Sequence, residues 1–268
     1  MDFKNLVKII YRTISCLTLA SMGLLLASFI SSFDMVNGYF TEGILPILFK
    51  ILFVVGILLS FVSILTLNKK GTLITNNNID KFKIVFLSLA ALLLICAFVF
   101  NFWIPNKMFI LSTAGACFFA AFVATCAIMQ GYEYNHLKLI CLLLSAAFPL
   151  FMVIDNNAVM VRHSNSVENT LSSVFAISFL IYILYEGKRI FTGEHSKWHF
   201  ASMLLLTHTG LPLSFSYIIV YLTGTATETF RFYQMILIFI ISVFVEIELI
   251  RFAKFSFINT QETEKTDV

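Results

Sequence analysis

The sequence predicts an all-helical integral membrane protein, a bundle of about eight transmembrane helices that forms a single membrane domain over residues 1–268. Hydrophobic residues make up 59% of the chain and charged residues 12%. The mean hydropathy is +0.90, well above that of a soluble domain. The apolar runs are about twice as long as the 9–11 residues of a barrel strand and do not alternate, so they indicate helices.

The first half of the chain contains four runs that approach or exceed the roughly 20 apolar residues needed to cross a bilayer. A basic lead precedes the first run, and no A-x-A cleavage site follows it, so we expect a retained helix and not a signal peptide. Pro46 is tolerated in the first turn of the second run. Trp103 and Pro105 mark the end of the third. The predicted spans are residues 13–33, 44–67, 84–104 and 108–130.

The second half has a similar layout. In both halves an outer loop starts with an aspartate, Asp34 or Asp155, and a basic connection and a helix pair follow. A parallel repeat of four spans plus four is one interpretation, and coincidence is the other. The predicted spans of this half are residues 139–154, 170–185, 199–222 and 232–250.

Basic residues are distributed unequally between the loops on the two sides of these spans. One side has only Lys107, Arg162 and Arg231. Because cytoplasmic loops carry an excess of Lys and Arg, the sequence predicts a multi-pass protein of the cell membrane with both termini in the cytoplasm. The residues assigned to the cytoplasmic side are Lys4, Lys8, Arg12, Lys69, Lys70, Lys81, Lys83, Lys138, Lys188, Arg189, Lys197, Arg251, Lys254 and Lys265.

The seventh run contains the least expected residue, a histidine close to the middle of an apolar helix. An ionisable side chain at that depth is costly in lipid, so we expect it to face the protein interior or a wet cavity and to have a partner. Pro212 cannot donate to the carbonyl of His208, which leaves a free acceptor beside the imidazole. Structural support with a kink and a ligand or proton path both remain open. The candidate site consists of Thr207, His208, Thr209, Pro212 and Ser216.

Further candidates lie in other spans. Pro149 frees the carbonyl of Ser145 in the fifth span, and two broken helices at similar depth are typical of substrate paths in transporters. Glu248 is spaced to meet Arg251, whereas Glu246 has no partner in its own helix and is a candidate for pairing with Lys188 or Arg189 across the bundle. A structural ion pair and a coupling carboxylate are the two interpretations of Glu246.

Two other charged residues are secondary candidates. Lys50 lies one to two turns inside the second span and can extend outward toward Glu42 or Asp34. Asp155 marks the outer end of the fifth span, as a helix terminus or as a binding residue.

The fourth span shows small residues at a four-residue spacing, and a shorter version occurs at Gly23, Ala27 and Ser31. Small residues on one face let helix backbones approach closely, so this pattern indicates packing and no chemistry. The face consists of Ser112, Ala116, Ala120 and Ala124.

The sequence lacks the enzyme motifs that are simplest to test. It contains no H-E-x-x-H, no G-x-x-x-x-G-K-[ST] and no G-x-S-x-G. The five cysteines fall inside apolar runs without a C-x-x-C pair, so we expect them to be reduced. We therefore expect no metal site, no cofactor and no nucleic-acid partner. A membrane-embedded enzyme is the least favoured class of function and stays open.

The segments Asp34–Phe40 and Tyr185–Arg189 resemble an uncharacterised bacterial family of multi-span membrane proteins. The resemblance covers about a tenth of the chain and implies no function or site. Three classes of function remain. A small-molecule or ion transporter comes first, a sensor or assembly subunit acting through partner proteins or as a homo-oligomer second, and a membrane enzyme third. The lipid bilayer is the partner common to all three.

Overall fold

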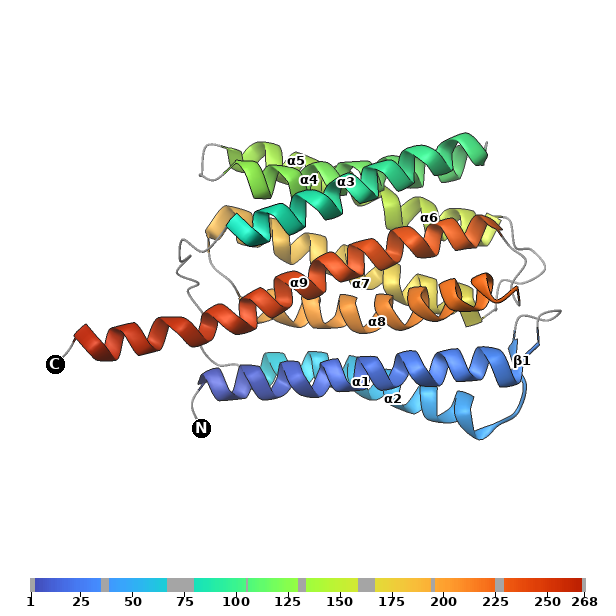
Figure 1. Cartoon of the computed structure of the whole chain (residues 1–268), viewed down its shortest axis with the longest axis horizontal. Coiled ribbons are helices and arrows are strands. Elements are labelled where there is room, and N and C mark those ends of the chain that lie inside the picture. Colours follow the sequence, from blue (N-terminus) through green and yellow to red (C-terminus); the bar gives the residue numbers. More distant parts are fainter. Residues whose placement is uncertain are drawn as a thin grey trace.

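The computed structural model describes residues 3–34, 39–66, 80–104, 106–129, 134–158, 167–193, 196–224 and 229–266. These residues form long helices that run side by side in one bundle (Figure 1). Seven stretches are long and apolar enough to cross a bilayer. The chain is therefore a multi-pass helical membrane protein. The seven stretches are Leu6–Ser32, Ile44–Thr66, Lys81–Trp103, Lys107–Ile128, Asn135–Asp155, Val167–Thr192 and Lys197–Leu222.

The first two helices form an antiparallel pair at one side of the bundle (Figure 1). Helix α1 (Phe3–Ser32) begins about three turns before the predicted span 13–33, so the basic lead is helical. Strands β1 (Phe33–Asp34) and β2 (Tyr39–Phe40) pair in antiparallel register and lead into α2 (Ile44–Thr66). The predicted second span is confirmed to within one residue.

Helices α3 (Asp80–Trp103) and α4 (Lys107–Ile128) form a second antiparallel pair. Their connection is short because Asn106 caps α4, its side-chain oxygen accepting a hydrogen bond from the backbone N–H of Met108 at 3.0 Å. The Thr113 hydroxyl donates to Asn101 at 2.5 Å across the pair. The two predicted spans 84–104 and 108–130 agree with these helices, and Pro105 lies outside the described residues.

The fifth predicted span, residues 139–154, lies within one stretch that is apolar and long enough to cross a bilayer, Asn135–Asp155, but the break in it is not where Pro149 indicated. The chain crosses here as two helices, α5 (Asn135–Leu144) and α6 (Ala147–Ala158), separated by a turn at Ser145 and Ala146. The N–H of Phe148 donates to the carbonyl of Ser145 at 3.0 Å. The break therefore lies upstream of Pro149, and the carbonyl that we expected to be free has a partner.

Three long helices complete the bundle. Helix α7 (Val167–Thr192) continues about two turns beyond the predicted end at residue 185, and α8 (Lys197–Leu222) matches the predicted run 199–222. Helix α9 (Thr229–Thr266) packs against α8 and α3 and extends past the bundle (Figure 1). The predicted span 232–250 lies inside it. Helix α8 has α1, α2, α7 and α9 as neighbours, which makes it the central helix.

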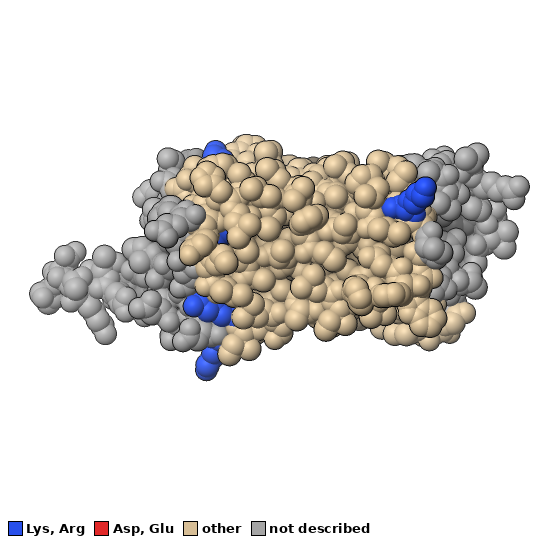
Figure 2. Space-filling model, turned by 90° about the horizontal axis from the view of Figure 1, so that it is seen from above, with Lys and Arg blue, Asp and Glu red and all other residues tan. Residues whose placement is uncertain are grey.

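Charged side chains gather near the two ends of the molecule. Figure 2 shows lysines and arginines there, with a broad uncharged belt between them. We call the end at which α1, α3, α5 and α8 begin the basic end, because Lys81, Lys188 and Lys197 lie at helix termini there. A belt of this kind is the surface expected of a protein that sits in lipid.

Candidate functional site

The candidate site of the seventh run lies in the interior of the bundle. The side chain of His208 is completely buried, and Thr207 and Thr209 are buried beside it. Helix α8 can keep these polar groups because it is enclosed by four other helices, so that few of its residues face lipid. Every polar group at this depth must find its partner inside the protein.

His208 finds its partners on two different helices. Its Nε2 lies 3.0 Å from the carbonyl oxygen of Phe53 on α2, and its Nδ1 lies 2.9 Å from the hydroxyl of Thr18 on α1. A carbonyl oxygen can only accept, so Nε2 carries a hydrogen and donates it to Phe53. In the neutral imidazole, Nδ1 then accepts a hydrogen bond from Thr18. The ring thereby joins α1, α2 and α8.

The same geometry also accommodates the charged imidazolium. The Thr18 hydroxyl lies 2.8 Å from the carbonyl of Ile14 in its own helix. If Nδ1 gains a proton it donates to Thr18, whose hydrogen turns to the carbonyl of Ile14. Thr18 therefore provides a hydrogen-bond partner for both protonation states of His208.

A glycine on α2 makes room for the ring. A Cβ on Gly56 would lie 2.1 Å from Nε2 of His208, closer than any real contact. The ring of Phe53 stacks on the imidazole with centroids 5.4 Å apart. Helix α2 thus carries both the carbonyl that binds the imidazole and the gap in which it lies.

A carboxyl group of α9 lies near the residue that precedes His208. Glu246 on α9 accepts a hydrogen bond from the hydroxyl of Tyr11 on α1 at 2.9 Å. The hydroxyl of Thr207, the residue before His208, is within hydrogen-bonding reach of the same carboxyl group. The expected pairing of Glu246 with Lys188 or Arg189 is not what the structure shows, because Glu246 binds Tyr11 and Arg189 binds Glu186 in its own helix.

The other residues of the predicted face divide into two groups. The Ser216 hydroxyl donates to the carbonyl of Met22 on α1 at 3.2 Å, two turns from His208. The Thr209 hydroxyl donates to the carbonyl of Leu205 in its own helix at 2.9 Å. Pro212 is buried within a helix that continues through it. His208 and Ser216 therefore join α8 to α1, whereas Thr209 forms its hydrogen bond within α8 and Pro212 is part of the same helix.

The small-residue face of α4 receives the break between α5 and α6. Ser112, Ala116 and Ala120 are buried, and Ala124 is half-buried. The hydroxyl of Ser112 donates to the carbonyl of Phe148 at 3.1 Å. A Cβ on Gly115 would lie 2.1 Å from the backbone nitrogen of Phe148. Ser145 and Pro149 thus belong to a close helix contact and lie apart from His208.

The remaining charged candidates lie in separate places. Asp155 is buried and accepts a hydrogen bond from the side-chain amide of Asn106 at 3.0 Å, which fixes α6 to the start of α4. Glu248 lies 3.6 Å from Arg251, the pairing that the spacing predicts. Lys50 is exposed on α2. The side chain of Asp34 lies outside the part of the chain whose side chains are described, so its contact with Lys50 stays a prediction.

The sequence did not single out a buried ionic cluster at the basic end. Glu186 on α7 accepts hydrogen bonds from Arg189 one turn on, and His199 Nε2 on α8 lies 2.6 Å from the same carboxylate. Glu186 and His199 are both almost fully buried. The three-residue spacing of Glu186 and Arg189 could have indicated this pair. The predicted sixth span ended at residue 185, however, which left both residues in a loop. At the other end Arg231 on α9 pairs with Glu168 on α7.

Within the described ranges, no three or more His, Cys, Asp and Glu side chains come close enough together to hold a metal ion. The five cysteines are free thiols. The chemistry available at the candidate site is therefore hydrogen bonding in two neighbouring groups, one around Glu246 with Tyr11 and one around His208 with Thr18 and Phe53. The chain matches no family model, no curated protein and no solved structure.

Proposed function

We propose that this protein is a small-molecule or ion transporter of the cell membrane, with eight spans and both termini in the cytoplasm. In this proposal α9 supplies the eighth crossing, and the basic end faces the cytoplasm because of its lysines and arginines. The polar row formed by Glu246, Tyr11, Thr207, His208 and Thr18 is the site that binds the transported species or the proton coupled to it.

The observation that carries this proposal is a fully buried imidazole near the middle of α8 and a carboxyl group inside the bundle on the neighbouring helix α9. His208 is the twelfth of the 26 residues of α8, close to the middle of a helix about 39 Å long. Glu246 lies within hydrogen-bonding reach of the adjacent Thr207. A charged side chain at the centre of a membrane helix costs about 2.5–3.5 kcal/mol, so such residues usually mark ion or substrate paths.

The partners of the two groups suit them to a change of protonation. His208 has a hydrogen-bonding partner in either state, as its contacts with Thr18 and Phe53 show. Glu246 is half-buried and accepts from a phenol, which stabilises its carboxylate. Three helices, α1, α8 and α9, meet at these contacts, so a change of charge there alters the forces between helices. Such a coupling of charge to helix position is the basis of a transport cycle.

Thermal unfolding of the purified protein in detergent tests the proposal. We expect one class in a panel of ions, amino acids, sugars, nucleosides and lipids to stabilise the chain by about 2.7 kcal/mol at 100 times its dissociation constant. Glu246→Gln should abolish the shift. Glu248→Gln is the matched control, since this acid is two residues away on the same helix and pairs with Arg251.

The stabilising compound is then tested for uptake into proteoliposomes with and without a pH gradient. Uptake that is lost in Glu246→Gln and kept in Glu248→Gln supports a transporter. A compound that stabilises both variants equally binds elsewhere, and a panel without any saturable shift contradicts the proposal.

A second candidate is a sensor or assembly subunit that works through partner proteins. The observation that favours it is the complete burial of His208, whose ring is enclosed by Phe53, Gly56 and Thr18. In a transporter this is the closed arrangement, whereas in an assembly subunit it is the permanent one. Extraction from its own membrane in polymer nanodiscs distinguishes the two: a subunit emerges in a complex of fixed composition larger than the 30.4 kDa chain.

A further inference from the structure

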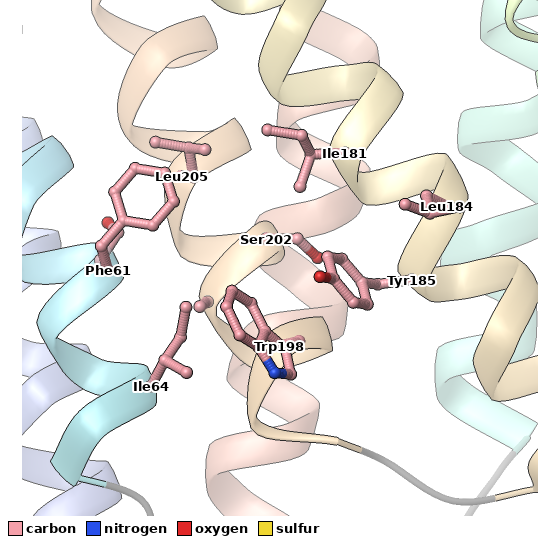
Figure 3. A pocket seen from close by; sticks show the side chains of 10 residues that line it. Phe61, Ile64, Ile181, Leu184, Tyr185, Trp198, Ser202 and Leu205 are labelled. Carbon is pink, nitrogen blue, oxygen red and sulfur yellow. The ribbon is translucent and has the colours of Figure 1, made fainter.

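We infer that the groove between α2, α7 and α8 binds an acyl chain of an anionic phospholipid, with the phosphate held by Lys188 and Lys197 at its mouth. The groove has a volume of about 170 Å³. It lies in the half of the bundle that contains the basic end, and its side chains point from three helices into one gap (Figure 3). This inference is independent of the transport proposal.

The floor and the rim of the groove differ in exposure. Ile64, Ala201 and Leu205 are at most 5% exposed and form the floor. Phe61 of α2 and Leu184 of α7 are 45% and 66% exposed and form the rim. The groove therefore opens sideways, toward the lipid that surrounds the uncharged belt. A molecule that enters it comes from the bilayer.

The two serine hydroxyls of the lining are already satisfied. The Ser60 hydroxyl donates to the carbonyl of Gly56 at 2.9 Å, and the Ser202 hydroxyl donates to the carbonyl of His199 at 2.7 Å. A gap of this size with an apolar lining does not hold water well and accepts hydrocarbon groups, as an apolar cavity of about 150 Å³ binds benzene. An acyl chain provides such groups.

The mouth of the groove has the features of a lipid headgroup site. Tyr185 and Trp198 stack with ring centroids 5.7 Å apart and an interplanar angle of 8°. Both line the groove (Figure 3), and tyrosine and tryptophan are enriched where a bilayer meets water. Lys188 is exposed one turn beyond Leu184 and Tyr185 on the same helix face, and Lys197 precedes Trp198. Two cations beside an acyl groove complement the charge of an anionic headgroup.

Glu186, the acid two residues before Lys188, is bound to other groups. Glu186 is buried on the other face of α7, where it binds Arg189 and His199. Within the described part of the chain, the ion pairs at this end join Arg189 and His199 to Glu186 and Arg251 to Glu248, and neither Lys188 nor Lys197 takes part in one. Their charge is therefore available to a phosphate.

Native mass spectrometry of the purified chain, with dioleoyl phosphatidylglycerol and dioleoyl phosphatidylcholine as probes, tests the inference. We expect one phosphatidylglycerol molecule to bind more tightly than phosphatidylcholine. The double variant Lys188→Gln/Lys197→Gln should weaken the binding of phosphatidylglycerol roughly 25-fold, at about fivefold for each lysine. The control Lys81→Gln/Lys83→Gln removes equal charge at the same end, on α3 and away from the groove.

A second variant tests the acyl chain separately from the charge. Ala201→Leu places a larger side chain in the floor of the groove, and it should weaken both lipids while leaving the preference for phosphatidylglycerol unchanged. The lysine substitutions do not alter the packed interior. They therefore still measure the effect of charge on phosphatidylglycerol binding if Ala201→Leu fails to fold. Equal loss in the two lysine pairs, or equal binding of the two lipids by the native chain, overturns the inference.

Discussion

The contact between Gly56 and His208 is the closest approach at the candidate site and makes a sharp prediction. Gly56→Ala should destabilise the protein by about 1–3 kcal/mol, because the new Cβ would lie 2.1 Å from Nε2 of the buried ring. In a His208→Ala background the space is free, and the same change should cost nothing. Thermal unfolding in detergent of the two single variants and the double variant gives the coupling energy.

Gly23→Ala is the matched control for this cycle. A Cβ there meets no atom within 4 Å, so the change should stabilise α1 by roughly 0.5–1 kcal/mol through helix propensity. If Gly56→Ala were equally benign with His208 present, the ring would lie elsewhere and the site as described would be wrong.

The sequence was sufficient to identify His208 as the central residue of the site, but it was not sufficient to identify the partners of His208. An imidazole in the middle of an apolar run is conspicuous because burial of such a group demands a partner. Thr18, Phe53 and Tyr11 carry no comparable signal, since a hydroxyl can bond its own helix and a backbone carbonyl has no sequence identity. Which helix packs against which is decided by tertiary contacts, and these made Glu246 the neighbour of Tyr11.

The buried ionic cluster at the basic end predicts unequal costs for two similar acids. Glu186 and Glu248 each have an arginine three residues further on, but Glu186 is buried and also binds His199. Glu186→Gln leaves Arg189 and the buried ring of His199 without their carboxylate partner, and we expect a loss of about 3 kcal/mol. Glu248→Gln should cost less than about 1 kcal/mol. Similar melting temperatures for the two variants would contradict the burial of Glu186.

At the scale of elements, the contact between α4 and the turn that joins α5 and α6 is the tightest between backbones. A Cβ on Gly115 would lie 2.1 Å from the nitrogen of Phe148 and 2.8 Å from the carbonyl carbon of Ala147. Backbone atoms cannot turn away as a side chain can, so Gly115→Ala should cost about 3 kcal/mol or more. Ser112→Ala removes one interhelical hydrogen bond and should cost only about 0.6 kcal/mol.

The same contact shows what the sequence could predict about elements. The small residues of the fourth span indicated a close helix contact, and most of them are buried. The partner was not predictable, because an apolar run gives no sign that a helix breaks at Ser145 and resumes at Ala147. Pro149 pointed to a break, but the irregular turn lies upstream, where Ser145 accepts from the N–H of Phe148. Proline sits in the first turn of the new helix, where it is tolerated.

At the scale of the whole molecule, apolar runs predicted most of the helices well because the bilayer requires long helices with satisfied backbones. Helix ends were predicted less well. Helices α1 and α7 extend past their predicted limits by two or three turns, since polar residues at a membrane surface can remain helical. The hydropathy of a segment therefore predicts which part of a helix lies in the bilayer, but it does not predict where the helix begins or ends.

The alternation of the helices makes a prediction about sidedness. Lys188 ends α7 at the basic end, and Lys107 begins α4 at the opposite end. In a chain whose five cysteines are replaced by alanine, Lys107→Cys should react with a membrane-impermeant maleimide in intact cells. Lys188→Cys should react only after permeabilisation, because the positive-inside rule predicts a cytoplasmic position for the basic end. Reaction of both cysteines in intact cells would require a different path for α4–α7, whereas the reverse pattern would invert the molecule and place the lipid groove in the outer leaflet.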